Sequence, residues 1–302
     1  MKISTRTAAG NRWLTAIAWG MEFVADPGRN IKDTLNDVSV ITTPPTPMNR
    51  GMYIEGTYNA TTETKELKTD LIMIGRGGHG YSTSEEGEID PITYPHAATD
   101  AGLFSPTPWL IRKVTEDLTG EMKAKYRLRR TFIKDGELYA AYFGRKIDLS
   151  RNEITEVLET VTDGKVISTR PYELTANDLR PQKTPLDTES PGVYLRTYAS
   201  FDLIMTEEEV EEYIMACTTL YGSPNKAIIS EIAYCFGKDK PVTKMYSTNE
   251  GSLTQVDAPA NTLEHVCTHV MVFETAYKPA IYTGAFGETK NIGISEPLYG
   301  TR

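Results

Sequence analysis

The chain has 302 residues, with 41 Asp and Glu against 32 Lys and Arg, and its formal net charge is -9. This acidity argues against a general nucleic-acid binder, because phosphate binding depends on a basic surface. The three cysteines are widely spaced and form no CxxC pair, which argues against a disulfide framework or a structural zinc site and favours a reducing compartment. There is no apolar run of about 18 residues and no signal peptide, so we expect a protein that does not associate with membranes.

The first predicted element is a short helix near the N-terminus, within residues 1–24. Trp13, Ile17 and Met21 recur at four-residue spacing, and Asn11 is placed to cap this helix. Residues 42–58 are rich in proline and predicted to be extended, yet they are too apolar for a free linker. We expect them to form an arm that lies on a neighbouring molecule.

A strand is predicted at 67–74, another at 110–114, and a β-hairpin at 126–146. Two runs of alternating residues flank Asp135 and Gly136 of this hairpin, and Asp-Gly between such runs is a strong hairpin signal. Neither strand of the hairpin has a wholly polar face. We therefore expect both faces to be covered, by the core of the protein or by a neighbouring chain.

A second hairpin is predicted around Asp163 and Gly164. Residues 192–205 alternate regularly, which predicts a strand with one apolar face made of Val193, Leu195, Thr197, Ala199, Phe201 and Leu203. The clearest helix follows: Thr206 and Glu209 form a capping box, and Gly222 ends it. Its predicted buried stripe consists of Val210, Ile214, Cys217 and Leu220 or Tyr221.

Residues 226–237 are predicted to form a strand, and the pattern at 263–277 fits a strand or a helix. The elements together predict an α+β, β-rich fold with antiparallel sheets or a sandwich, one clear amphipathic helix and long extended arms. The predicted domains are an N-terminal helix and Pro-rich arm at 1–62, a β-rich body at 63–277 and a C-terminal tail at 278–302.

The glycine-rich stretch GRGGHG at 75–80 is the first candidate for ligand binding. A P-loop requires Lys-Ser or Lys-Thr after the glycines, and a dinucleotide fingerprint requires a helix there. The sequence continues instead with YSTSEEGEIDP, which has no Lys-Ser or Lys-Thr and is interrupted by Gly87 and Pro91. We therefore expect a loop that forms contacts rather than a phosphate cradle.

His265, Cys267 and His269 are weak candidates for a metal site, because all three would project from one face of a regular strand. A metalloprotease helix requires Glu directly after the first His, where this chain has Val266. The simpler interpretation is a half-buried strand of mixed composition. We predict no metal and no cofactor, and a metal-dependent enzyme that uses His265 and His269 remains a further alternative.

No pattern of nucleophilic catalysis is present: there is no Gly-x-Ser-x-Gly elbow, and acidic pairs are expected in any chain of this composition. We therefore predict that the protein is not an enzyme. Its Pro-rich segments, its strands without a polar face and its 17 tyrosines suit a protein that completes its core with other copies or partners.

Two stretches resemble segments of virion structural proteins of large contractile-tailed bacteriophages. They are AKYRLRRTFIKDGELYAAYFGRKIDLS (124–150) and YGSPNKAIISEIAYCFG (221–237). The resemblance covers about 60–70 residues in the regions 124–150 and 206–237, and ISEIAYCFG is similar to a pattern of tail- and baseplate-associated proteins. It implies a strand that makes contacts between subunits, and it brings no catalytic residues with it.

The resemblance implies a structural subunit of a virion, assembled in the host cytoplasm, in the tail or baseplate, with a neck or capsid-associated (head) position as the alternative. The expected partners are copies of itself and other virion proteins, with no general nucleic-acid or membrane binding. Tyrosine, phenylalanine and arginine side chains are expected to form the interface, since Tyr, Phe and Arg are enriched at such surfaces. They are Tyr53, Tyr58, Tyr126, Arg127, Arg129, Arg130, Tyr139, Tyr142, Phe143 and Arg145.

Overall fold

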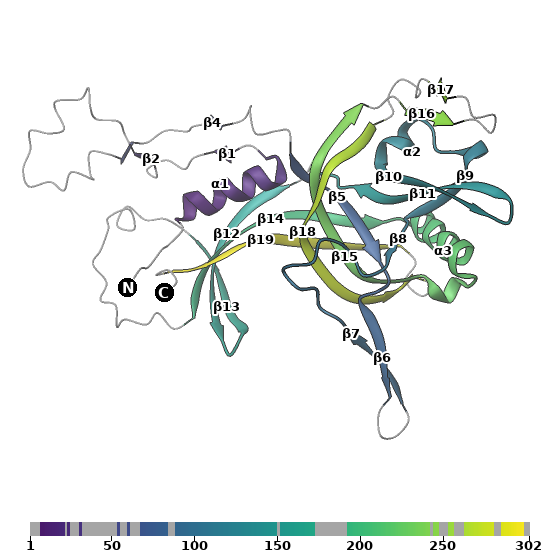
Figure 1. Cartoon of the computed structure of the whole chain (residues 1–302). Coiled ribbons are helices and arrows are strands. Elements are labelled where there is room, and N and C mark those ends of the chain that lie inside the picture. Colours follow the sequence, from purple (N-terminus) through teal and green to yellow (C-terminus); the bar gives the residue numbers. More distant parts are fainter. Residues whose placement is uncertain are drawn as a thin grey trace, which may run out of the picture. The chain divides into compact units, whose positions relative to one another are not determined.

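A computed structural model describes most of the chain (Figure 1). The described residues are 7–21, 23–24, 30–31, 53–54, 59–60, 67–83, 88–149, 152–172, 192–241, 244–247, 253–256, 263–280 and 285–298. The expected arm at 42–58 lies outside them, apart from the backbone of Tyr53 and Ile54, and Tyr58 lies outside them too. Among the described helices none is long and apolar enough to cross a membrane.

The chain divides into two compact units. Unit 1 comprises residues 1–65, 151–201 and 290–302, and unit 2 comprises residues 66–150 and 202–289. The body expected at 63–277 is therefore split between two units. The expected C-terminal tail is also divided, and much of it is regular strand. The fold is β-rich with antiparallel sheets, as predicted.

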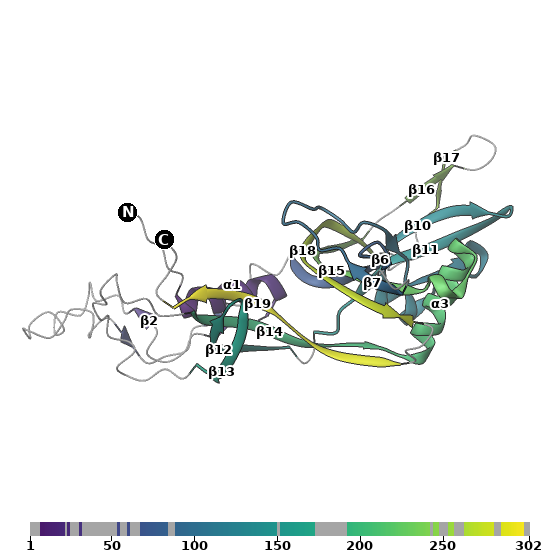
Figure 2. The same cartoon turned by 90° about the horizontal axis from the view of Figure 1, so that it is seen from below.

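In its described residues, unit 1 contains one helix and a four-stranded sheet in the order β13-β12-β14-β19. Its elements are α1 (Ala8–Trp19), β1 (Phe23–Val24), β2 (Asn30–Ile31), β3 (Tyr53–Ile54), β4 (Asn59–Ala60), β12 (Glu153–Thr162), β13 (Lys165–Pro171), most of β14 (Val193–Met205) and most of β19 (Phe286–Pro297). The predicted alternation of β14 is confirmed, because Leu195, Ala199 and Phe201 are buried. Figures 1 and 2 both show β14 and β19 side by side.

Helix α1 forms near the predicted place but buries a different face. Its N-cap is Thr7, whose hydroxyl oxygen accepts a bond from the backbone N–H of Gly10, so the predicted cap at Asn11 is wrong. Asn11 lies inside the helix and is buried, whereas Trp13 is exposed. The reason is Trp19, whose ring packs on that of Phe201 at 4.8 Å between centroids and fixes the rotation of the helix.

Unit 2 is built on a larger antiparallel sheet whose main path is β10-β11-β5-β15-β18, with β8 paired to β5 and β9 to β11. Its strands are β5 (Lys68–Gly75), β6 (His79–Thr83), β7 (Ile89–Thr93), β8 (Pro106–Thr107), β9 (Leu110–Lys113), β10 (Tyr126–Lys134), β11 (Glu137–Lys146), β15 (Ile228–Pro241), β16 (Lys244–Ser247), β17 (Leu253–Val256) and β18 (Leu263–Pro279). Its helices are η3 (Val114–Glu116), α2 (Gly120–Lys125), α3 (Glu207–Tyr221) and η4 (Pro224–Lys226).

Clusters of apolar side chains lie in the core of unit 2, and two of them are formed by described residues. Leu71, Ala233 and Cys235 form one, on the neighbouring strands β5 and β15. Ile111, Ala141 and Ala216 form the other, in which α3 packs against β9 and β11. These contacts explain why the hairpin strands lack a polar face: side chains of the same chain cover much of their surface.

Both predicted Asp-Gly turns are confirmed. Asp135 and Gly136 have φ of 51° and 81°, and Asp163 and Gly164 have φ of 50° and 74°. Positive φ at both central residues is the type I′ geometry that matches the twist of a hairpin. The ambiguous segment at 263–277 is the strand β18.

The predicted capping box of α3 is also confirmed. Thr206 accepts a bond from the N–H of Glu209, and the carboxylate of Glu209 accepts one from the N–H of Thr206. Gly222 ends the helix with φ of 77°. Its buried residues are Val210, Tyr213, Ala216 and Cys217, so Val210 and Cys217 of the predicted stripe are confirmed, while Ile214 is only half-buried.

Candidate functional site

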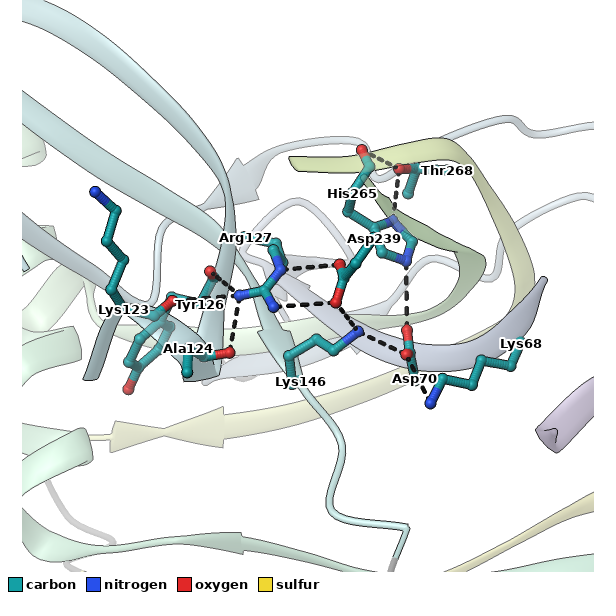
Figure 3. Close-up of polar contacts among 10 residues, drawn as sticks. All are labelled: Lys68, Asp70, Lys123, Ala124, Tyr126, Arg127, Lys146, Asp239, His265 and Thr268. Carbon is teal, nitrogen blue, oxygen red and sulfur yellow. Dashed lines mark hydrogen bonds and ion pairs between the residues drawn. The ribbon is translucent and has the colours of Figure 1, made fainter. Parts of the chain in front are cut away.

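A group of charged and polar side chains lies where five strands of unit 2 meet, and we call it the charged cluster (Figure 3). Each of the five strands contributes at least one member. The cluster consists of Asp70 on β5, Arg127 on β10, Lys146 on β11, Asp239 on β15, and His265 and Thr268 on β18. Asp70, Arg127 and His265 are buried, and the others are half-buried.

Arg127 is the most fully bonded member of the charged cluster. Its Nε and Nη2 donate to the two oxygens of Asp239 at 2.9 and 3.0 Å. Its Nη1 donates to three backbone oxygens at the end of α2 and the start of β10, those of Lys123, Ala124 and Tyr126. Arginine is suited to this place because its planar guanidinium donates in several fixed directions at once.

Lys146 joins the two carboxylates of the charged cluster. Its Nζ lies 2.6 Å from Oδ2 of Asp70 and 3.0 Å from Oδ2 of Asp239. The other oxygen of Asp70 lies 3.3 Å from Nε2 of His265, whose Nδ1 is 2.8 Å from the hydroxyl of Thr268. The chain of contacts therefore runs from β10 to β18 without a gap (Figure 3).

The positive groups of the cluster keep both aspartates ionised. Burial by itself would raise the pKa of Asp70, but the contacts with His265 and Lys146 outweigh it and lower that pKa below its ordinary value. Burial likewise opposes ionisation of Asp239, and the bonds from Arg127 and Lys146 lower its pKa. Both carboxylates thus form ion pairs with cationic side chains of the same chain.

A second polar group surrounds Glu231, which is fully buried on β15, and we call it the glutamate anchor. Its carboxylate accepts four hydrogen bonds, from the backbone N–H of Gly77, Phe104 and Ser105 and from the ring of His96, at 2.8 to 3.0 Å. The GRGGHG loop is therefore a contact-forming loop, as predicted, and part of it wraps a carboxylate of its own chain.

Both ring nitrogens and both faces of the His96 ring have contacts in the glutamate anchor. Its Nε2 lies 3.0 Å from Glu231 and its Nδ1 lies 3.0 Å from Asp100. Carboxylate oxygens only accept, so the ring satisfies both when each nitrogen carries a hydrogen. The rings of Phe104 and Phe273 stack on its two faces at 4.0 Å each. A histidine enclosed in this way holds the segment at 96–104 to β15 and β18.

Glycine is required next to Glu231 for reasons of space. A Cβ at Gly75 would lie 2.4 Å from an oxygen of Glu231, and one at Gly78 would lie 2.5 Å from the backbone oxygen of Ser230. Real Cβ contacts are never this short. These glycines let the loop approach β15 closely, which is a known reason for glycine in loops.

The weak metal candidates do not share one environment. His265 pairs with Asp239 in the ladder and is buried, whereas His269 pairs with Phe236, stacks on its ring at 5.5 Å and is exposed. An extra residue in β18 at this point breaks the regular alternation. The side chain of Cys267 lies outside the described residues. Within the described part of the chain, no three His, Cys, Asp or Glu side chains are grouped so that they could hold a metal ion.

Most of the expected interface residues of the hairpin have partners within the chain. Tyr126, Arg127 and Tyr142 are buried, so in this conformation they are not available to another molecule. Arg129 and Tyr142 both bond to Asp117, and Arg145 pairs with Glu209. Burial and the neighbouring Glu209 raise the pKa of Tyr126 to about 12.

The remaining hairpin residues differ in exposure. Tyr139 and Phe143 are half-buried and pack with the apolar cluster below α3, whereas Arg130 is exposed. The side chain of Tyr53 and all of Tyr58 lie outside the described residues. The basic hairpin surface suggested by the sequence is therefore largely neutralised by carboxylates of the same chain.

The sequence did not point to Glu231, nor to the roles that His96 and Asp70 have in these groups. One signal was present: Glu231 is the one charged residue in the run AIISEIAYCFG at 227–237, and a buried charge requires a partner. The partners themselves come from residues 77, 96, 104 and 105, more than 120 positions away, and no local pattern marks them.

No curated protein and no solved structure matches this sequence. A family of unknown function (DUF7208) matches it over residues 1–302. Because the match spans the whole sequence, the chain belongs to this family.

Proposed function

We propose that this chain is a non-enzymatic structural subunit of a tailed-bacteriophage virion, placed in the tail or baseplate, which acts through contacts with copies of itself and other virion proteins. The resemblance of residues 124–150 and 221–237 to virion proteins motivates the proposal. In this proposal the subunit is assembled into the particle in the host cytoplasm.

The observation that carries the proposal is a set of apolar side chains exposed on three hairpins. Ile89 on β7 is 68% exposed, Ile133 on β10 is 74% exposed and Ile167 on β13 is 63% exposed. On the β10–β11 hairpin Ile133 stands directly opposite Leu138, which is also exposed, so the two form one apolar tip. Grouped apolar side chains on projecting elements are typical of protein contact sites.

The strand β13 offers a second kind of contact. All its residues, Lys165–Pro171, are exposed, and within the described part of the chain it pairs only with β12. The N–H and C=O groups on the other side of such an edge can add a strand from another molecule. A subunit that completes its sheet in an assembly would carry an edge of this kind.

The polar groups support the same proposal. The charged cluster and the glutamate anchor use their bonds to hold strands and loops of the same chain together. The thiols of Cys217 and Cys235 are buried, and burial raises their pKa, to about 11 and about 12 respectively. Thiols of this kind are poor nucleophiles at neutral pH.

The apolar tip provides the test. The double variant Ile133→Thr/Leu138→Thr is supplied in cells infected by virus that lacks the gene, and its amount per particle is measured by quantitative mass spectrometry. We expect about tenfold less incorporation, because two apolar contacts would be lost. Met215→Gln, which changes an exposed side chain on α3, is the matched control and should incorporate normally.

The folded state of each variant is checked by thermal unfolding and by far-UV circular dichroism. Threonine suits a strand, so the double variant should fold like the wild type. Normal incorporation of a correctly folded double variant would show that the apolar tip is not needed for assembly.

A further inference from the structure

Arg76 differs from the other arginines that are not exposed. Each of those, in the part of the chain that the structure describes, lies against a carboxylate; they are Arg12, Arg112, Arg127, Arg129, Arg145 and Arg196. Arg76 instead lies over the ring of Tyr221, with its central carbon 4.6 Å from the ring centroid. Its Nε is buried and has no hydrogen-bond partner among the described residues.

His79 follows three residues later and also has unused bonding capacity. Its Nδ1 is buried and has no hydrogen-bond partner in the part of the chain that the structure describes, and its ring packs edge-on against Tyr81 and Tyr277. Burial lowers the pKa of His79 and the positive charges of Arg76 and Lys226 lower it further, against a bond to the backbone of Arg76 and the negative charge of Glu231, which raise it. Lys226 is exposed at the end of η4 and its charge acts on His79, so three basic side chains of unit 2 are close enough to influence one another.

Among the described residues, no carboxylate forms an ion pair with Arg76, His79 or Lys226, and Glu231 is the acid whose charge acts on His79. The carboxylate of Glu231 already accepts four bonds, and Arg76 is not one of the donors. The backbone N–H of Gly77 and of Gly78 are also taken, by Glu231 and by the hydroxyl of Ser230. A ligand here would therefore be held by side chains and not by the glycine-rich backbone.

We propose that Arg76, His79 and Lys226 form a binding site for an oxyanion, a carboxylate or phosphate group. A guanidinium presents parallel N–H donors that match two oxygens of such a group, and the ammonium of Lys226 adds a point charge. This site is independent of the proposed role in a virion, because it requires only the folded chain.

The four histidines of the chain allow a direct measurement by NMR, since each gives its own ring resonances. Sodium phosphate and sodium acetate are titrated separately into the full chain, with sodium chloride keeping the ionic strength constant. We expect a saturable shift of the His79 resonances and a rise of its titration midpoint by about half a pH unit or more, because a bound anion stabilises the charged ring. A response to phosphate alone would assign a phosphate group, and a response to acetate would assign a carboxylate.

Substitutions locate the site. Arg76→Gln should abolish the saturable response, and Lys226→Gln should weaken the affinity about fivefold. Arg130→Gln is the matched control, because Arg130 is exposed and no described carboxylate pairs with it, and it should respond like the wild type.

The resonances of His96 and His265 report whether the fold of a variant is intact. If Arg76→Gln disturbs these resonances, the anion affinity of Lys226→Gln tests the site instead. The side chain of Lys226 is exposed, so its replacement should leave the fold unchanged. The proposal is overturned if neither anion gives a saturable shift, if chloride alone reproduces it, or if the folded Lys226→Gln variant binds as well as the wild type.

Discussion

Glu231 is a buried carboxylate that joins the loop after β5, the segment at 96–105 and the strand β15. Its removal would leave the backbone N–H groups of Gly77, Phe104 and Ser105 without the acceptor that the fully buried Glu231 provides. Leaving buried donors unsatisfied costs more than the bonds themselves contribute. The stability of this part of unit 2 is therefore expected to depend on one residue.

Glu231→Gln should lower the free energy of unfolding by about 3 kcal/mol, since the amide has the same shape but places its own donors against those of the loop. Chemical denaturation measures this change. Glu208→Gln, which alters an exposed glutamate of α3, is the matched control and should have almost no effect. Equal stability of the two variants would show that the anchor is not needed.

Asp70 and Asp239 make the free energy of unfolding depend on pH in the acidic range. Their folded-state pKa values are lowered, so they stabilise the fold above their ordinary value near 3.8 and cease to do so as the pH falls through the folded value. Denaturation between about pH 5 and about pH 2 should thus show a steep loss of stability. Asp239→Asn should flatten this dependence, whereas Asp90→Asn, at an exposed position, should retain it.

At this scale the sequence predicted residue types better than residue roles. It marked the arginines of the 126–146 hairpin and the glycines at 75–80, and both matter in the structure. Their partners, such as Asp239 for Arg127 and Glu231 for Gly77, are more than 100 positions away. Local patterns contain no information on such pairs. Arginines that pair with carboxylates of their own chain were therefore predicted to lie on an interface with other molecules.

The elements with strong local signals were predicted well. The Asp-Gly turns require positive φ, and the capping box of α3 satisfies backbone N–H groups locally, so both are encoded within a few residues. The rotation of α1 was not predictable, because the contact between Trp19 and Phe201 fixes it from a distance. The extra residue in β18 is equally hidden, since only its pairing with β15 reveals it.

Thr206→Ala should lower the stability of α3 by about 1 kcal/mol, because the cap bond to the N–H of Glu209 would be lost. Thermal unfolding would detect this as a lower midpoint. Thr218→Ala is the control within the same helix: Thr218 is exposed and bonds back to the oxygen of Ile214. Its replacement should be neutral or slightly stabilising, and a larger loss at Thr218 than at Thr206 would contradict the role of the cap.

For the whole molecule the sequence predicted the β-rich class but not the division into two units. Each unit is assembled from separated parts of the chain, with residues 151–201 joining 290–302 in unit 1. The strand β19 illustrates the difficulty: it has no strong alternation, yet it pairs with β14, and Asn291 within it and Leu298 directly after it bond to Ser200 and Val193 of β14. Tertiary pairing, and not local propensity, makes this segment a strand.

The central claim is that this chain is a building block of a virus particle. The most direct test is quantitative mass spectrometry of particles purified from cells infected by the virus that encodes it. The account predicts that the chain is present in a fixed, whole-number ratio to the other structural proteins and remains with the particle through density-gradient purification. Its absence from such particles, with abundant free chain in the same cells, would contradict the proposal.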